Sequence, residues 1–409
     1  MALALLALSS CARWDYWRGA RAYAAGDFKL ALRCLTPIAN EGYAKAQFLL
    51  GKIYAKGDGV PVDLVEASRW LRRAADQGNA DAEYSLAWSY QHGTGVSKDM
   101  GEAVRWYRKA ADQGNADAQC NLGSIYADGE GVPRDDVEAA HWYRKAADQG
   151  EPDSQTRLGW MYAHGEGVPK DVIEAARWFR KAAQRGNVEA QANLAWAYEK
   201  GLGVRKDPSE AVRWYRKAAD RGDGYSQVRL GVMYSGCTGA PRDDAEAVRW
   251  YRKAAAQGNA DGQAGLGTMY QNGRGVPQNA AEAARWYRMA ADQGIAFAQA
   301  QLGQMYADGA GVRQDGSEAA RWCRRAADQG NAQAQFALGA MYESGKGVPR
   351  DLVEAYKWNA LAAGSEDSVA PAAQQERDRV EHLLTPSQLA EGQRRTHEWV
   401  ARAEDNLHQ

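Results

Sequence analysis

The sequence has few of the residue patterns on which catalysis or metal binding usually depends. It holds five cysteines in 409 residues, and no Cys-x-x-C pair occurs among them, so a zinc ribbon or a thioredoxin-like site has no support. Neither Gly-x-Ser-x-Gly nor His-Glu-x-x-His occurs, and the six histidines are scattered along the chain. We therefore predict no catalytic residue, no bound metal and no cofactor.

The chain also lacks a charge surplus of either sign. Lys and Arg number 51 against 52 for Asp and Glu, which gives a formal net charge of −1. A protein that captures nucleic acid through its phosphates needs a clear basic surplus. We therefore expect no nucleic-acid partner. With 45% hydrophobic and 25% charged residues, the composition is typical of a folded chain rather than a disordered one.

The sequence has no hydrophobic run long enough to cross a membrane, and its apolar opening stretch is too short to do so. That stretch leads into Leu-Ser-Ser-Cys11, which resembles the lipobox of a bacterial lipoprotein signal. Residues 1–11 would then be a truncated signal, and Cys11 the lipidated residue. The stretch starts without Lys or Arg and is shorter than a normal signal. A start codon placed too far downstream accounts for both departures.

Two locations therefore remain open from the sequence. If the signal is real, the protein is exported to the bacterial periplasm or envelope, and its only membrane contact is a lipid anchor on Cys11. If it is not, the opening stretch is an apolar tail on a cytoplasmic protein.

The sequence is rich in tryptophan, tyrosine and glycine, and these residues recur with a period of 36. The period runs through nine copies without an insertion, which chance does not produce, so the chain is a repeat protein. The recurring tryptophans are Trp70, Trp106, Trp142, Trp178, Trp214, Trp250, Trp286, Trp322 and Trp358, and the recurring leucines run from Leu50 to Leu338.

Each copy is predicted to form two helices. In the second copy, Asn79 is placed to cap a first helix that runs to about His92. Asp99 with Glu102 three residues later forms a capping box, which predicts a second helix that stops at Gly114. A Gly-x-Gly pair between the helices permits backbone angles that a Cβ would forbid. Because a two-helix unit cannot bury its apolar faces alone, the copies are expected to stack, with the recurring Trp and Tyr side chains in the core.

The repeated motif Ala-x-x-Leu-Gly-x-x-Tyr-x-x-Gly-x-Gly-Val-x-x-Asp-x-x-Glu-Ala-x-x-Trp-Tyr-Arg-Lys-Ala-Ala resembles the Sel1-like repeat family, a relative of the tetratricopeptide repeat. The resemblance covers nine repeats in residues 42–364, and it implies an all-α, right-handed α-solenoid of stacked helix-turn-helix units. Residues 12–41 are similar to one tetratricopeptide unit that would cap the first repeat. Residues 365–409 resemble the C-terminal capping helices of such proteins. One loop, at Cys237, departs from the motif.

Positions that vary between repeats are where a solenoid would recognise its partner. If the repeats fold like tetratricopeptide repeats, the first helix of each repeat lines the concave face. In the first two-thirds of the chain, the variable positions of that face hold aromatic residues interleaved with Asn and Arg. The predicted partner-binding residues are Phe48, Tyr84, Trp88, Asn121, Arg157, Trp160, Asn193, Trp196 and Arg229.

Two pairs of these residues indicate how a partner would be held. Some tetratricopeptide proteins clamp a peptide carboxylate with Asn and Arg from successive repeats, and the matching positions here hold Asn121 with Arg157 and Asn193 with Arg229. Arg presents two parallel donors to a carboxylate, and the tryptophans would add apolar contact. The structural alternative is that the tryptophans pack between helices and the arginines pair with acidic residues. Those acidic residues are Asp117, Asp153 and Glu189.

The predicted function is a non-catalytic scaffold or adaptor, monomeric, that binds a protein or peptide client on its concave face, through a carboxylate-bearing segment of the client. Two alternatives remain. One is a cell-envelope factor that binds peptidoglycan or its peptide stem. The other is a β-lactamase-like hydrolase, since some Sel1-like proteins have been linked to β-lactams. The hydrolase is disfavoured because a serine β-lactamase needs Ser-x-x-Lys, which occurs nowhere in the sequence.

Overall fold

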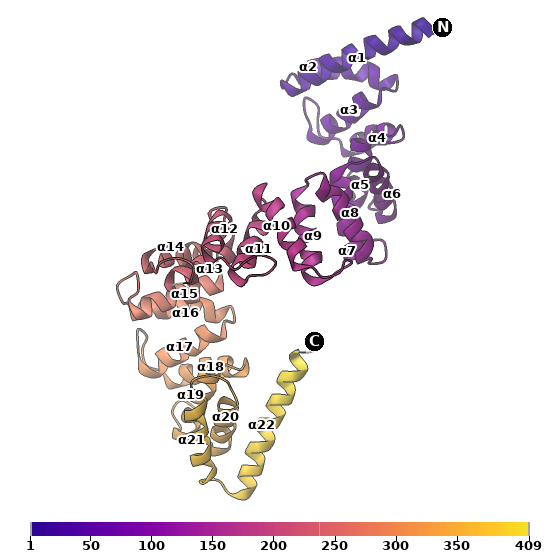
Figure 1. The fold of residues 1–409 in the computed structure, drawn as a ribbon. Coiled ribbons are helices and arrows are strands. Elements are labelled where there is room, and N and C mark those ends of the chain that lie inside the picture. The colour runs from indigo at the N-terminus through magenta and orange to yellow at the C-terminus, as the bar shows by residue number, and fades with distance from the viewer. Residues whose placement is uncertain (1, 237, 408–409) are drawn as a thin grey trace. The chain divides into compact units, whose positions relative to one another are not determined.

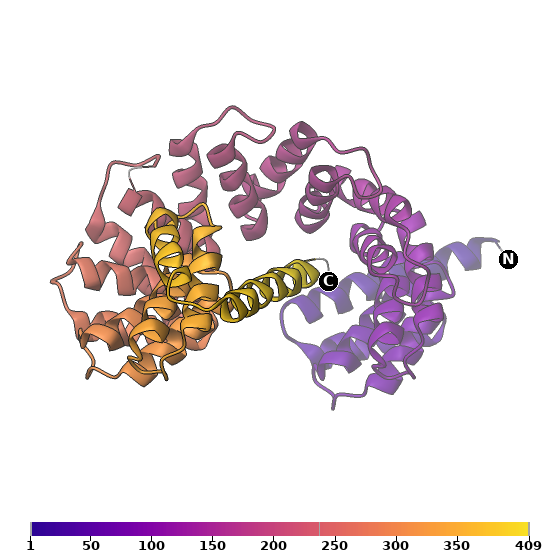
Figure 2. The ribbon, with the colours of Figure 1, turned by 90° about the horizontal axis from the view of Figure 1, so that it is seen from below.

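The computed structural model describes residues 2–236 and 238–407 (Figure 1). These residues form 22 α-helices joined by loops, with no strand among them. The chain divides into two compact units, Met1–Lys206 (unit 1) and Asp207–Gln409 (unit 2). In each unit, successive helices lie side by side as pairs, and each pair packs on the next (Figures 1 and 2). The predicted all-α solenoid is confirmed.

Unit 1 opens with one helix pair and continues with the first repeats. In each repeat, the odd-numbered helix is the first helix and the even-numbered helix is the second. The helices of unit 1 are α1 (Ala2–Ala24), α2 (Phe28–Asn40), α3 (Ala44–Lys56), α4 (Leu64–Ala75), α5 (Ala80–His92), α6 (Met100–Asp112), α7 (Ala116–Asp128), α8 (Asp136–Asp148), α9 (Pro152–His164), α10 (Val172–Gln184) and α11 (Val188–Lys200).

Unit 2 begins with the second helix of a repeat and ends with two helices that follow the last repeat. Its helices are α12 (Pro208–Asp220), α13 (Gly224–Gly236), α14 (Asp244–Ala256), α15 (Ala260–Asn272), α16 (Ala280–Asp292), α17 (Ala296–Asp308), α18 (Gly316–Asp328), α19 (Ala332–Ser344), α20 (Leu352–Ala363), α21 (Ala370–Glu381) and α22 (Pro386–Leu407).

Capping side chains set where the helices begin and end, as the sequence predicts. Asp99 accepts a hydrogen bond from the backbone N–H of Glu102 at 3.0 Å, which starts α6. In the same way Asn79 accepts from the N–H of Ala82 at 2.9 Å and starts α5. Helix α5 ends at Gly93, whose φ of 70° lies in the left-handed region that favours glycine. The residues that set the ends of each helix are therefore local in the sequence.

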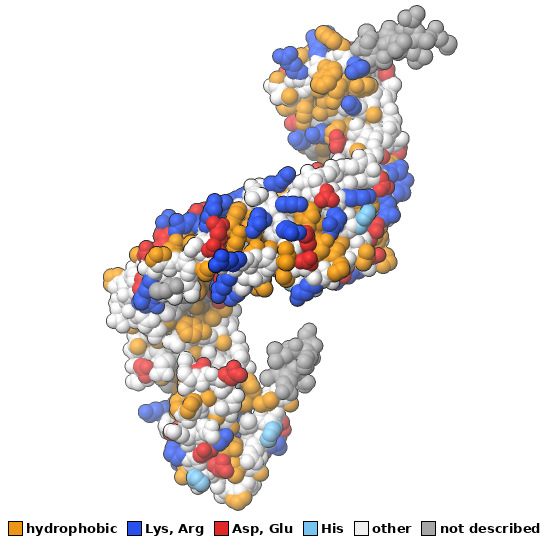
Figure 3. Space-filling view, in the orientation of Figure 1, with side chains coloured by type: hydrophobic (Ala, Val, Ile, Leu, Met, Phe, Trp, Pro, Cys, Tyr) orange, Lys and Arg blue, Asp and Glu red, His pale blue; other side chains and the backbone are white. Residues whose placement is uncertain are grey.

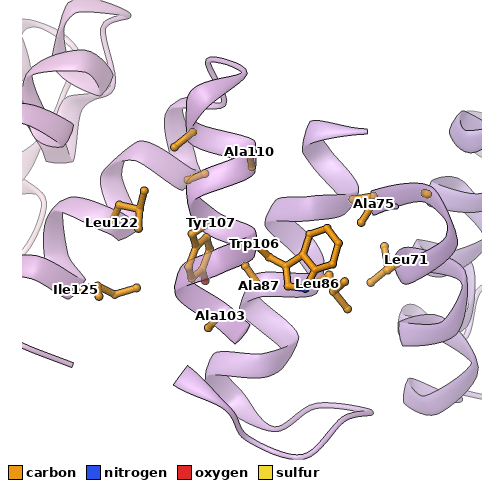
Figure 4. Packing of buried hydrophobic residues seen from close by; sticks show 14 of the residues in the cluster. Leu71, Ala75, Leu86, Ala87, Ala103, Trp106, Tyr107, Ala110, Leu122 and Ile125 are labelled. Carbon is orange, nitrogen blue, oxygen red and sulfur yellow. The ribbon is translucent and has the colours of Figure 1, made fainter. Parts of the chain in front are cut away.

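Trp106 and Tyr107 show how the recurring aromatics build the core (Figure 4). Trp106 is 1% exposed and lies beside Leu86 of its own repeat, on the side of the preceding repeat. Tyr107 is fully buried and points the other way, toward Leu122 and Ile125 of the next repeat. Two adjacent residues thus contact opposite neighbours. Of the recurring tryptophans, Trp286 is half-buried and the others are buried.

The tyrosines near the end of each first helix are half-buried rather than core, which corrects the prediction for them. Tyr126 is an example, because its hydroxyl accepts a hydrogen bond from Nη2 of Arg108 at 2.6 Å. The guanidinium of Arg108 also lies over the Tyr126 ring, 5.8 Å from its centroid, and pairs with Glu138 at 2.9 Å. The sequence pattern did not reveal this role, in which the tyrosine joins a charged network between repeats.

Glu83 is a buried acid at a position where the other repeats hold glutamine. The glutamines are Gln47, Gln119, Gln155, Gln191, Gln227, Gln263, Gln299 and Gln335. Gln119 donates from Nε2 to the carbonyl oxygen of Ala111 at 2.9 Å, and most of the others make the same bond. An ionised carboxylate has no proton to donate there. Glu83 is 3% exposed, and burial raises its pKa despite Lys109 and a hydrogen bond from Gln113.

We therefore expect Glu83→Gln to stabilise the protein at pH 7 by about 1 kcal/mol, because the amide supplies the missing donor. The raised pKa means that the wild type has its full stability below the ordinary pKa of glutamate. It loses stability as the pH rises through the raised value. The advantage of the variant should therefore shrink between pH 7 and pH 4 in urea unfolding followed by circular dichroism. An advantage that stays constant with pH would contradict the argument.

Two helices, α21 and α22, follow the last repeat in the segment for which the sequence predicts capping helices. Helix α22 begins at a capping box in which Gln388 Oε1 accepts from the backbone N–H of Thr385 at 3.0 Å. An ion pair of 2.7 Å between Arg395 and Glu354 joins it to α20. No helix in the described part of the chain has the length and apolar character to cross a membrane. The side chain of Cys11, the predicted lipidation site, and the whole of Cys237 lie outside the described residues.

Candidate partner-binding surface

Unit 1 carries its predicted binding residues on the first helices of successive repeats, α3, α5, α7, α9 and α11. We call the outward side of these helices the first-helix surface. It exposes three large aromatic residues, Trp88 (43%), Trp160 (36%) and Trp196 (41%). Phe48 and Tyr84 are half-buried and pack against the core beneath. The three tryptophans are therefore more exposed than those that recur in every repeat, although Trp160 also packs edge-on against the buried ring of Phe179, with 6.0 Å between centroids.

Two of the exposed tryptophans are held by a histidine one turn later. The rings of Trp88 and His92 stack with 4.3 Å between centroids, and those of Trp160 and His164 with 5.0 Å. Nδ1 of each histidine lies 2.9 and 3.0 Å, respectively, from the carbonyl oxygen of its tryptophan. Because a carbonyl oxygen only accepts, Nδ1 must carry the proton. Each indole is thus oriented on the surface before any partner arrives.

Arg157 lies next to Trp160 on α9 and is exposed. It makes no ion pair with any residue in 2–236 or 238–407, so the alternative pairing with the acidic residues is not found there. Glu189 instead accepts a hydrogen bond from Nε1 of Trp160 at 2.9 Å, and Asp153 accepts one from Nδ2 of Asn187 at 2.7 Å. The guanidinium of Arg157 does lie close enough to the Tyr143 hydroxyl for its charge to favour ionisation of that group, whose pKa burial nevertheless raises overall.

The asparagines are placed differently from what a carboxylate clamp requires. Asn121 is half-buried and lies close to the hydroxyls of Tyr84 and Tyr107, where it partly offsets the rise in their pKa that burial causes. Nδ2 of Asn193 is buried and has no hydrogen-bond partner among the described residues. In the repeat before that of Asn193, the residue that corresponds to Tyr107 is Phe179, which has no hydroxyl group. Within unit 1, the outward polar group of the predicted clamp is therefore Arg157.

Arg229, the last predicted residue, lies on α13 in unit 2 and is half-buried. It is near enough to Tyr251 for its charge to favour ionisation of that hydroxyl, whose pKa is nevertheless raised overall by burial. Arg157 stands in the same relation to Tyr143, so the two arginines differ in exposure, because Arg157 is exposed and Arg229 is half-buried.

Two pockets in unit 1 lie beside the exposed tryptophans. One, of about 310 Å³, is lined by Arg157, Trp160 and Tyr143 together with charged side chains of both signs, which are Asp128, Arg134, Asp136 and Glu166. The other, of about 300 Å³, lies beside Trp88 between α3, α4 and α5, and its lining is mainly apolar. Neither pocket was predicted from the sequence. The second had a signal that could have been noticed, because Leu71 stands where the next six repeats hold Tyr or Phe and the last two hold Cys323 and Asn359.

Charges of both signs are mixed over the visible face of unit 1 (Figure 3). Many arginines of the second helices pair with glutamates one turn earlier, as Arg105 does with Glu102 at 2.7 Å. This mixture favours a solvated face over an anion-binding one. Within residues 2–236 and 238–407, no three His, Cys, Asp or Glu side chains gather as metal ligands would.

The repeats match known proteins along most of the chain. The family model described as Sel1 repeat matches nine stretches, which are residues 44–79, 80–115, 116–151, 152–187, 188–223, 224–259, 260–295, 296–331 and 332–364. No curated protein matches the chain.

Two solved structures are similar over most of their length. One is a protective antigen present in uropathogenic Escherichia coli strains that displays an SLR fold, with 33% identity over 98% of this chain and 94% of that chain and a TM-score of 0.67. The other is a Sel1 repeat protein from Oxalobacter formigenes, with 36% identity over 75% of this chain and 89% of that chain and a TM-score of 0.60. With nine matching repeats on the helix pairs described above, the chain belongs to the Sel1 repeat family.

Proposed function

We propose that this Sel1 repeat protein is a non-catalytic scaffold that binds a protein or peptide client on the first-helix surface of unit 1. The observation that carries the proposal is the exposure of Trp88, Trp160 and Trp196 on one row of helices. Tryptophan is enriched at the energetic centres of protein interfaces, because its large surface gains much when water is excluded. Stacking on His92 and His164 orients two of the indoles in advance, which lowers the entropy lost on binding.

The arrangement of the helices supports this choice of face. The first helices α7 and α9 contact each other directly across successive repeats. Such a contact is expected on the inner side of a curved stack, which repeat proteins use for extended clients. Arg157 adds a charge to this side and suits a carboxylate of the client, through two parallel N–H···O bonds.

The test is a crosslinking pull-down with mass spectrometry from cells of the native host. The variant changes Trp88, Trp160 and Arg157 to alanine together. The expected result is at least about a tenfold loss of the enriched client. Truncating one hot-spot residue costs about 1 kcal/mol or more of binding free energy, and about 1.4 kcal/mol corresponds to a tenfold change in affinity. A client recovered equally well by the variant would contradict the proposed surface.

A matched control removes two other exposed tryptophans, Trp14 and Trp17, which are 66% and 67% exposed on α1. This variant loses as much exposed aromatic surface but leaves the first-helix surface intact, so it should retain the client. The proposal excludes catalysis, and turnover of the β-lactam nitrocefin by the purified protein would overturn that part.

For location we propose the bacterial envelope, with a lipid anchor on Cys11, on the strength of the lipobox-like Leu-Ser-Ser-Cys11. The second candidate partner in the envelope is the peptide stem of peptidoglycan, which carries free carboxylates. Retention on isolated sacculi, lost in the variant of Trp88, Trp160 and Arg157, would identify that partner. Recovery of the protein in the cytosolic fraction would reject the proposed location and leave the binding surface untouched.

A further inference from the structure

One buried position on the second helix holds a different type of residue in the first repeat than in the six repeats that follow. In the next six repeats it holds an aromatic side chain, but in the first repeat it holds Leu71. The aromatic residues are Tyr107, Tyr143, Phe179, Tyr215, Tyr251 and Tyr287. All six are buried, and Leu71 is buried as well. The first repeat therefore keeps an apolar residue at this position but lacks the aromatic ring.

The other repeats show where the absent ring would lie. The ring of Tyr143 rests against Gly123, and its hydroxyl forms a hydrogen bond of 2.9 Å with Oγ of Ser124. The hydroxyl of Tyr107 donates to Oε1 of Gln91 at 2.8 Å and also meets Asn121. The ring thus occupies the space between the first helix of its own repeat and that of the next repeat.

In the first repeat, the 300 Å³ pocket lies in this space. Its lining includes Gly51 and Ala55 of α3, Leu71 of α4, and Ser85 and Ser89 of α5. These are the counterparts of the residues that surround the ring in the later repeats.

The pocket is wider still because Ser89 stands where the next repeat has Ile125. An enclosed apolar cavity of roughly 150 Å³ is known to bind benzene, so this larger, open pocket has room for a phenol ring.

We infer that this pocket receives an aromatic side chain, that of tyrosine, from the bound client. The inference rests on the proposed function and specifies the chemistry of the client. The six aromatic counterparts show that this backbone accommodates such a ring, and Leu71 leaves the place open.

The rim of the pocket indicates which kind of residue lies next to the tyrosine in the client. Trp88 and Lys52 both line the pocket, and Lys52 is exposed. The indole of Trp88 supplies an apolar wall at the entrance, and the ammonium of Lys52 attracts a carboxylate on the neighbouring residue or at the chain end. The expected ligand is therefore a tyrosine adjacent to a carboxylate.

The first test uses 4-methylphenol, which is the tyrosine side chain, and follows its binding to the full chain by saturation-transfer NMR. We expect binding with a dissociation constant on the order of 1 mM. Leu71→Tyr places the ring of the later repeats in the pocket and should weaken binding at least about tenfold. Leu71→Met keeps the volume and should bind like the wild type. Equal binding by wild type and Leu71→Tyr, or no binding by the wild type, would overturn the inference.

A second filling variant keeps the test decisive if Leu71→Tyr does not fold. Ser89→Ile introduces the side chain of the next repeat from the opposite wall and should also reduce binding at least about tenfold. The carboxylate preference is measured by comparing N-acetyltyrosine with N-acetyltyrosinamide. The acid should bind more tightly to the wild type, and the difference should disappear in Lys52→Met. No difference in the wild type would reject the role of Lys52.

The client pull-down separates this inference from the proposed function. If the client is lost when Trp88, Trp160 and Arg157 are changed but kept by Leu71→Tyr, the surface is correct and the pocket inference is wrong. If 4-methylphenol binds as expected but the triple variant retains its client, the pocket is correct and the proposed surface is wrong.

Discussion

Replacing Gly167 with alanine is expected to lower the free energy of unfolding by about 3–5 kcal/mol, enough to unfold part of the chain at 37 °C. Gly167 is the second glycine of a loop and has a φ of 64°, a conformation that costs alanine about 1–2 kcal/mol. In addition, a Cβ at Gly167 would overlap the carbonyl oxygen of Asp136 in the preceding repeat. That oxygen belongs to the backbone and cannot rotate away, so the stacking of the two repeats must open.

A matched variant separates the clash from the backbone strain. Gly114 has a φ of 91°, and a Cβ there would meet nothing within 4 Å. Gly114→Ala should therefore lower the free energy of unfolding by only about 1–2 kcal/mol. Urea unfolding followed by circular dichroism at 222 nm gives both values. If the two variants lose the same stability, the contact between the loop of Gly167 and Asp136 does not hold the repeats together.

Most of the fold could be predicted because the signals that define it are local. Asn79 and Asp99 cap their helices through bonds to residues three positions away, so the helix boundaries follow from short segments of sequence. The period of 36 then fixes how many such pairs there are. The contact of Gly167 with Asp136 could not be predicted, because the spacing alone does not say which backbone the loop approaches in the neighbouring repeat.

The binding surface was predictable to a smaller extent. Trp88 and Trp160 stand at a position that holds Ser124 in the repeat between them, so they cannot be required by packing that every repeat shares. Their exposure follows from that argument. The same argument failed for Asn121, because Tyr84 and Tyr107 of the preceding repeat lie close to it and leave it half-buried. A variable residue on a solenoid therefore faces a client only when the adjacent repeats leave it unpaired.

The second prediction concerns the stability lost when a buried tryptophan of the recurring set is removed. Trp106→Ala should lower the free energy of unfolding by about 3–5 kcal/mol, because the indole is 1% exposed and its loss leaves a cavity between two repeats. The variant also breaks the 3.1 Å hydrogen bond from Nε1 to Glu102 and removes the ring under Lys109, whose Nζ lies 4.1 Å from the centroid. Thermal and urea unfolding measure the loss.

Trp160→Ala, the matched variant, should lower the free energy of unfolding by less than about 1 kcal/mol. It removes a residue of the same size that is 36% exposed, together with one hydrogen bond to Glu189 on the surface. If Trp160→Ala were as destabilising as Trp106→Ala, Trp160 would be a packing residue and the client surface would lose its central contact. A small loss of stability combined with a large loss of client would instead show that the same side chain builds the solenoid at one repeat position and binds a partner at another.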